Sequence, residues 1–211
     1  MKSLEAYDLI RDKILVGEKL PGTRLILADL ESELAIGRVP IRDALMRLDR
    51  SGLVKNIPYK GAVVAAPPKR KEIAYIYDIR IDLEIKLALE AMDNLTKSDF
   101  KELNRLNMEM HKIGIEYYSL DRQFHDTIYT ASNLPHLCVI VQKLVLPAEV
   151  YLNINRQEVD DCRTFNNEHQ EIIDSLKDRN SDKLRSALEA NIRGGLIVIE
   201  RTLDRTVRFK G

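Results

Sequence analysis

The fold is decided by residues 27–54, which read LADLESELAIGRVPIRDALMRLDRSGLV. This stretch predicts two short helices joined by a tight corner. The first helix carries Leu27, Leu30, Glu31 and Leu34. The second has apolar residues at i, i+3, i+4 and i+7, which form one inward face: Ile41, Ala44, Leu45 and Leu48. Between them, Ala35-Ile36-Gly37 provides the corner of a helix-turn-helix. Gly37 suits a helix N-cap, and Pro40 falls in the first turn, where a missing N–H costs nothing.

Arginines lie on the second helix away from its apolar face, at Arg38, Arg42, Arg47 and Arg50. A short helix with a buried stripe and an arginine-bearing N-terminal half can enter a DNA major groove. Residues 55–64 follow and predict a two-stranded hairpin with Lys60-Gly61 at its tip. The whole pattern is that of a winged helix-turn-helix. Its candidate DNA contacts are Arg38, Arg42, Arg47, Lys60 and Gly61.

The run from Gly37 to Leu48, with Ser51-Gly52-Leu53-Val54 after it, resembles the DNA-binding signature of GntR-family transcriptional regulators. That signature is a Ser-Arg-Thr-Pro-Val-Arg-Glu-Ala-Leu core followed by Leu and then Gly-Leu-Val. Arg38 and Arg42 match it, whereas Gly37 replaces the N-cap Ser or Thr and Val39 replaces the next Thr. The chain therefore lacks two hydroxyls through which family members commonly touch phosphate or base.

Composition points to a soluble cytoplasmic protein with a local basic region. The chain has 211 residues, of which 45% are apolar and 31% charged, and its formal net charge is zero. Between residues 38 and 60, however, six Lys and Arg stand against two Asp, a net of +4. Cys138 and Cys162 have no CxxC spacing, so we expect free thiols. No apolar run approaches membrane-spanning length, and no signal peptide begins the chain.

The rest of the chain predicts helices without a trustworthy strand. We expect a winged helix-turn-helix DNA-binding domain at 1–66 and an all-helical domain at 67–211, which the family resemblance implies is an effector-binding and dimerisation domain. The first domain should open with a helix at 3–17 and a turn at 20–25. The second should be an all-α bundle of six or seven helices, and the fold class mainly α. Its expected helices are 70–93, 97–114, 117–131, 135–153, 165–178 and 181–206. Pro147 should bend or split the fourth, and Ser98 and Asn180 or Ser181 are expected caps.

Polar residues interrupt the apolar stripes of three predicted helices. Asp121 and His125 are four residues apart and so share a face, His169 lies in an otherwise apolar stripe, and Asn191 lies in another. A carboxylate and imidazoles that converge inside a bundle are good ligands for a divalent transition metal. The alternatives are a hydrogen-bonded core histidine and an Asp121–His125 pair on the helix surface.

The segment from Leu120 to His125, with Asn133 downstream, resembles the Asp-x-x-x-His stretch of the FCD effector domain of FadR-like GntR regulators. Glu168-His169 resembles its later part. Many members bind a metal through that Asp and three histidines. The resemblance implies ligands at Asp121, His125 and His169, with Asn191 where the third histidine would fall. It implies zinc, nickel or manganese, held weakly because an amide oxygen is a poorer ligand than imidazole.

Arg80 interrupts another apolar stripe and has two interpretations. It either bridges to Glu84, one turn away, or presents its guanidinium to a ligand carboxylate. FCD-like domains commonly take small organic acids beside the metal, so the resemblance favours an effector-binding role for Arg80. The implied protein is a homodimeric regulator of a pseudo-palindromic operator, controlled by a small organic acid.

Two alternatives to that protein stay open. One is a non-haem metal-dependent enzyme that uses the Asp121, His125 and His169 set. No separate acid or base joins this set, and a winged helix-turn-helix has no place in such chemistry, so we expect no enzyme activity. The other is a regulator with a metal-free pocket, which the asparagine at position 191 allows.

Overall fold

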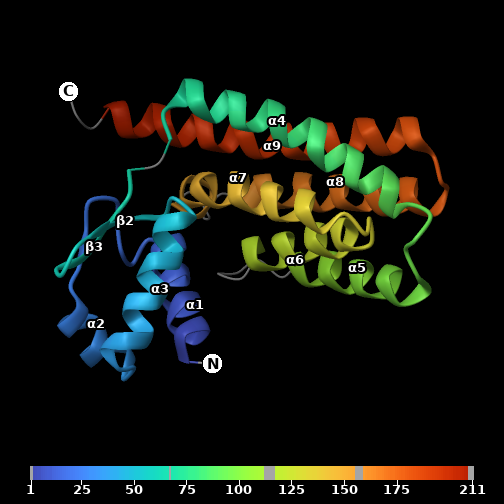
Figure 1. Ribbon diagram of the computed structural model, residues 1–211. Coiled ribbons are helices and arrows are strands. Elements are labelled where there is room, and N and C mark those ends of the chain that lie inside the picture. The colour runs from blue at the N-terminus through green and yellow to red at the C-terminus, as the bar shows by residue number, and fades with distance from the viewer. Residues whose placement is uncertain (1, 67, 112–116, 155–158, 209–211) are drawn as a thin grey trace. The chain divides into compact units, whose positions relative to one another are not determined.

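The computed structural model describes residues 2–66, 68–111, 117–154 and 159–208 (Figure 1). The chain forms two compact units, Met1–Lys69 with Leu146–Ile154, and Arg70–Val145 with Asn155–Gly211. Most of the described chain is helical, with one small sheet in the first unit. The predicted fold class, a winged helix-turn-helix followed by a helical bundle, is confirmed.

The helix α3 organises the first unit. The helices of this unit's N-terminal part are α1 (Lys2–Leu15), α2 (Leu27–Leu34) and α3 (Arg38–Arg50), and α3 packs against both of the others and against the hairpin. Its four predicted inward residues are all buried, and they meet Ile10 and Ile14 of α1 in one core. The apolar spacing read from the sequence therefore does place the arginines of α3 on the outside.

The corner between α2 and α3 is as tight as predicted. Ala35 ends α2 in the left-handed region with φ 52°, Ile36 is buried, and Gly37 is the extended N-cap of α3. Left-handed backbone costs a non-glycine residue free energy, because its Cβ crowds the following carbonyl. Burial of Ile36 supports the turn against that cost.

Three short strands form an antiparallel sheet in the order β1-β3-β2. They are β1 (Arg24–Leu25), β2 (Val54–Ile57) and β3 (Gly61–Val64). The sequence predicted the hairpin but assigned 20–25 wholly to a turn, which is wrong for Arg24 and Leu25, since these pair with β3. Two residues are too few to show an alternating pattern, so β1 carries no sequence signal of its own.

The tip of the hairpin lies earlier than predicted. Ile57 pairs with Gly61, and the N–H of Lys60 donates to the carbonyl of Ile57, so residues 58–60 form the turn. Gly61 is buried at φ 102°, and a Cβ there would collide with the carbonyl oxygen of Leu25. Glycine is required at this position by backbone approach and not only by the turn.

Six helices among the described residues build the second unit, except that the part of α7 from Leu146 onward belongs to the first unit. They are α4 (Arg70–Ala91), α5 (Lys97–Met110), α6 (Tyr117–Thr130), α7 (Pro135–Ile154), α8 (Val159–Lys177) and α9 (Ser181–Arg208). In Figure 1, α4 runs along α9, and α9 also packs on α8. Helix α5 packs against α6 and α8, and α6 also contacts α4. Side chains from α4, α6, α8 and α9 can therefore meet in the interior of this unit.

Several helix ends differ from the prediction. Thr96, not Ser98, caps α5, through a capping box with Asp99. Helix α8 begins at Val159, whereas the sequence predicted a start at residue 165. Helix α7 continues through Pro147 without being split. Asn180 accepts from the N–H of Lys183 and so confirms the cap expected at the start of α9.

Some predicted features lie outside the described residues. These are residue 67, where the second predicted domain begins, and residues 112–114 of the helix predicted at 97–114, and the same holds for the side chain of Cys162. Cys138 is a free thiol that donates to the carbonyl of Tyr129 at 3.2 Å. None of the described helices combines the length and apolar character needed to cross a membrane.

Candidate DNA-binding surface and buried metal site

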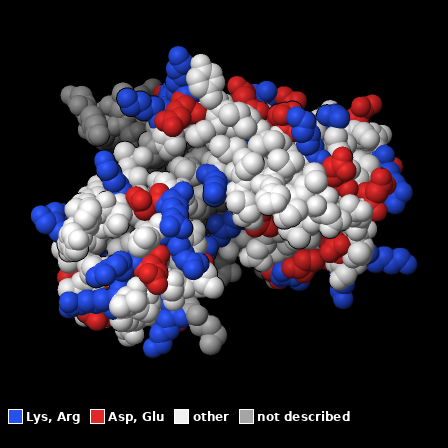
Figure 2. Space-filling model, viewed as in Figure 1, with Lys and Arg blue, Asp and Glu red and all other residues white. Residues whose placement is uncertain are grey.

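The outer face of α3 carries the arginines predicted to contact DNA. Arg38, Arg42 and Arg47 are all exposed. In Figure 2, basic side chains predominate over the part of the molecule that holds α2, α3 and the hairpin, whereas the helical bundle mixes both signs. Val39 lies among these arginines, and 69% of its surface is exposed. The N-terminal half of α3 thus offers guanidinium groups and one exposed apolar side chain to a partner.

An acidic residue of α2 holds one of these arginines. The Nε of Arg38 donates to Glu31 Oε2 at 2.6 Å, and both side chains are well exposed. An exposed pair of this kind adds little stability. It does restrict the rotamers of Arg38, so Glu31 orients a guanidinium that was predicted to reach base edges.

The hairpin tip presents an aromatic residue next to the predicted lysine. Tyr59 is fully exposed and sits in the left-handed region at φ 63°, while Lys60 beside it is also exposed. The buried Gly61 offers less surface than the sequence suggested. Lys60 and Tyr59 are therefore the side chains that this turn can bring to a partner.

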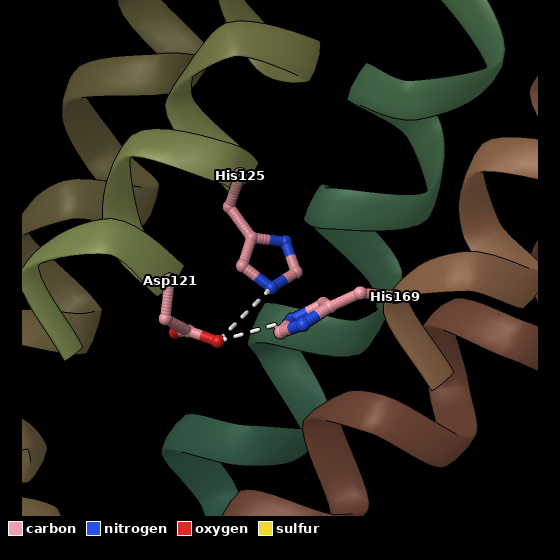
Figure 3. A group of neighbouring side chains, drawn as sticks. All are labelled: Asp121, His125 and His169. Atoms are coloured by element: carbon pink, nitrogen blue, oxygen red, sulfur yellow. Dashed lines mark ion pairs between the residues drawn. The ribbon is translucent and has the colours of Figure 1, made fainter. Parts of the chain in front are cut away.

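In the second unit, Asp121 and His125 of α6 and His169 of α8 converge (Figure 3). Asp121 Oδ1 lies 3.1 Å from His169 Nε2 and 4.0 Å from His125 Nε2. One ligand atom of each residue lies within 4.8 Å of the other two. Two helices distant in sequence thus bring one carboxylate and two imidazoles to one point.

Burial and charge set the protonation states at this point. Burial raises the pKa of Asp121, but His169, His125 and Arg80 outweigh it and hold that pKa below its ordinary value. Burial lowers the pKa of His125, and Asp121 opposes this only in part. Asp121 is therefore ionised and His125 neutral near pH 7, which are the forms that bind metal ions.

The unsatisfied atoms of His169 fit a metal at this site. Its side chain is fully buried, and neither ring nitrogen has a hydrogen-bond partner among the described residues, although Nε2 faces Asp121. A buried polar atom without a partner costs free energy, and coordination through Nε2 would remove that cost for this nitrogen. The donor set of two nitrogens and one carboxylate suits zinc and neighbouring transition metals.

Asn191 of α9, the predicted fourth ligand, has a protein partner. It is buried, and its Nδ2 donates to Glu168 Oε2 at 3.1 Å. Burial raises the pKa of Glu168, and the bond from Asn191 partly offsets this. The amide oxygen of Asn191 is the atom that could ligate a metal, since its nitrogen serves Glu168.

Arg80 of α4 makes the bridge that was one of its two interpretations. Its Nε donates to Glu84 Oε1 at 2.7 Å, and the guanidinium lies 4.5 Å from the centre of the Tyr77 ring. Burial would lower the pKa of Arg80, but Glu84 raises it above its ordinary value. Arg80 is 8% exposed, so any ligand carboxylate it met would have to enter the bundle.

Comparison with known proteins decides the family. A model of the bacterial regulatory proteins of the gntR family matches residues 2–64, and a model of the FCD domain matches residues 75–194. The chain belongs to the GntR family. It carries an FCD domain in its second unit and is a transcriptional regulator. The non-haem enzyme that the sequence left open is not supported, since the related proteins are regulators.

Two curated relatives and a solved structure illustrate the likeness of this GntR-family regulator. The HTH-type transcriptional regulator McbR of Escherichia coli K12 is 30% identical over 147 residues, which cover 67% of this chain and 66% of that protein. The gluconate operon transcriptional repressor of Bacillus subtilis 168 is 27% identical over 201 residues, covering 88% and 79%. The structure of E. coli McbR/YncC gives a TM-score of 0.84 at 25% identity and covers 95% of this chain and 98% of that one.

The sequence did not predict a site role for four residues that the structure places at or beside the candidate sites of this regulator. Glu31 was counted only as part of the α2 stripe, and Tyr59 was passed over in favour of Lys60 and Gly61. Glu84 was weighed only as a partner of Arg80, although its second oxygen serves Tyr129. Tyr129 continues the Asp121–His125 face by one more turn, and that spacing of four was a signal in the sequence.

Proposed function

We propose that this GntR-family regulator binds a pseudo-palindromic operator as a homodimer and inserts the N-terminal half of α3 into the major groove. The observation that carries the proposal is the division of α3 into two faces. One face is buried in the core, and the opposite face exposes Arg38, Arg42 and Arg47. Arginine pairs with guanine through two hydrogen bonds, which suits it to base reading. Lys60 and the turn around Gly61 would contact the DNA backbone beside the groove.

The FCD domain of the proposed regulator holds a divalent metal and a small organic acid that alters operator affinity. Asp121, His125 and His169 would be the metal ligands, with the oxygen of Asn191 as a weaker fourth. A bound metal would supply open positions that attract a carboxylate. Arg80 would face the same acid with the part of its guanidinium that Glu84 does not engage. The repressor of a gluconate operon among the relatives agrees with control by an acid.

Metal and acid should bind cooperatively in this proposal. Each would raise the affinity of the protein for the other by the same factor, because the coupling free energy between two sites is reciprocal. A regulator with a metal-free pocket would bind the acid equally well in the presence of a chelator. Calorimetric titration of candidate acids with and without zinc separates the two cases.

Selection from random DNA tests the central part of the proposal. The full-length protein would be incubated with a library of random duplexes, and the retained sequences would be amplified and read. We expect an inverted repeat whose half-sites are spaced by about one helical turn, or a multiple of it. Arg42→Ala should enrich such a repeat much more weakly. Recovery of unrelated sequences by the wild-type protein would contradict sequence-specific binding.

A further inference from the structure

A line of buried polar groups runs from Arg80 to the candidate metal site. The carboxylate of Glu84 accepts from Arg80 Nε at 2.7 Å through one oxygen and from the hydroxyl of Tyr129 at 2.6 Å through the other. The oxygen of Tyr129 in turn lies 3.0 Å from His125 Nδ1. Arg80, Glu84 and Tyr129 are all buried. The line thus links helix α4 to helix α6 through side chains alone.

The chemistry of these groups fixes the direction of each hydrogen bond. A guanidinium only donates, and a carboxylate only accepts. The single hydrogen of the Tyr129 hydroxyl is therefore directed to Glu84. A phenol is un-ionised at neutral pH, so the hydroxyl keeps this hydrogen. The Tyr129 oxygen can then only accept from His125, which requires a hydrogen on Nδ1.

We infer that Arg80, Glu84 and Tyr129 are positioning residues that fix the hydrogen of His125 on Nδ1 and so turn the lone pair of Nε2 toward Asp121 and His169. This inference rests on the metal site of the proposed function. A neutral imidazole has one hydrogen, so Nε2 of His125 carries a lone pair and lies 4.0 Å from Asp121 Oδ1. Two acceptors that face each other across this distance suit a cation between them. The opposite tautomer would place an N–H there.

The line could instead serve only to satisfy buried polar groups and hold α4 against α6. The two roles differ in what they require of His125. A purely structural role tolerates either tautomer, provided that every group has a partner. The positioning role requires one tautomer, and it predicts that the tautomer changes when the direction of the bonds is reversed.

Glu84→Gln reverses that direction with almost no change of shape. Arg80 must still donate, so it would hold the amide oxygen, and the amide nitrogen would then donate to the oxygen of Tyr129. The Tyr129 hydroxyl would be free to donate to Nδ1 of His125, which must carry a lone pair to accept. The hydrogen of His125 should therefore move to Nε2. Tyr129→Phe removes the link instead and should leave a mixture of both tautomers.

The experiment reads the tautomer directly in metal-free protein. Long-range ¹H–¹⁵N correlation spectra of protein labelled with ¹⁵N-histidine would distinguish the two ring nitrogens, and His125→Gln would assign the signal. We expect Nδ1–H in the wild type, Nε2–H in Glu84→Gln and a mixture in Tyr129→Phe. Tyr75→Phe is the control, since Tyr75 is an exposed tyrosine of α4, the same helix as Glu84, and lies outside the line.

Zinc affinity, measured by competition with a chromophoric chelator, provides the second readout. Loss of a group that orients a metal ligand typically lowers affinity about 10- to 100-fold, so we expect this loss in Tyr129→Phe and Glu84→Gln and none in Tyr75→Phe. Nε2–H in the wild type, or an unchanged tautomer in both Tyr129→Phe and Glu84→Gln, would overturn the inference. The predicted tautomers without zinc binding by the wild type would overturn the proposed metal site and leave the tautomer assignment standing.

Discussion

The two units differ in where their functional polar residues lie: on the exposed face of α3 in the first unit, and in the interior of the bundle in the second. In the DNA-binding unit the arginines of α3 lie in solvent, and all the buried polar residues found among the described residues belong to the helical unit instead. There, Arg80 and Glu84 of α4 and His169 of α8 are buried. Exposed charges need no fixed partner, whereas each buried polar group needs a partner or an ion to offset its desolvation. The exposed arginines of the first unit suit a large charged partner, and the buried polar groups of the second suit the small ligand that we propose for it.

This difference also limits what a mutation can do. A change to an exposed arginine should alter only what that side chain contacts, because surface substitutions seldom disturb the fold. A change inside the bundle should alter the hydrogen bonds of the other groups in the same buried network.

The metal site offers the largest effect. His125→Ala should lower zinc affinity by at least about 100-fold, since it removes a ligand and leaves Asp121 and His169 too few to hold the ion. Operator affinity without effector should stay within about twofold of the wild type, because the DNA contacts lie in the other unit. Elemental analysis after zinc loading and dialysis measures the first quantity, and fluorescence anisotropy the second. Equal loss of zinc and DNA binding would show that the units do not act separately.

The recognition helix comes next. Arg42→Ala should weaken operator binding by about 10- to 100-fold if the guanidinium reads a base through two hydrogen bonds. Arg50→Ala is the matched control, since Arg50 is an exposed arginine at the far end of the same helix. Anisotropy titrations of both variants on the selected operator make the comparison. Equal losses in the two variants would mean that α3 contributes charge alone.

The sequence predicted the DNA-binding unit more completely than the helical unit, because most features of the first are local in sequence. The helix-turn-helix is a local pattern: its apolar spacing, its corner at Ala35 and its N-cap at Gly37 all lie within one short stretch, and the structure has them where the sequence put them. Strand β1 and the close approach of Gly61 to Leu25 could not be predicted, because both depend on pairing between residues far apart in sequence.

In the helical unit the sequence could mark polar residues within apolar stripes but could not pair them. Asp121, His125 and His169 were grouped through a family resemblance, and the structure brings them together. The bond from Asn191 to Glu168 and the one from Tyr129 to Glu84 were not foreseen. Each joins two helices, and helix spacing alone does not specify which faces meet.

Restoring the third histidine should sharpen the contrast between the units. Asn191→His should raise zinc affinity by about tenfold, since imidazole binds zinc better than an amide oxygen does, and leave operator affinity unchanged. The bond to Glu168 is lost in this variant, so thermal unfolding should be recorded alongside. Elemental analysis and chelator competition measure the gain. Absence of bound zinc in Asn191→His would refute the geometry proposed for the site.

The smallest effect is expected at the hairpin. Lys60→Ala should weaken binding to all DNA sequences alike and reduce the slope of log affinity against log salt by about one, since one phosphate contact is lost. Lys101→Ala, an exposed lysine of α5, should leave the slope unchanged. Titrations at several salt concentrations decide this. A loss confined to the operator would place Lys60 on a base rather than on phosphate.

Sequence selectivity of the wild-type protein tests the account most directly. The measurement is the ratio of two dissociation constants at physiological salt, one for a scrambled duplex and one for the selected operator of the same length. Specific regulators typically exceed their non-specific affinity by about a thousandfold or more, and we expect such a ratio here. A ratio near one, from protein shown to be folded, would contradict the claim that the exposed face of α3 reads DNA sequence.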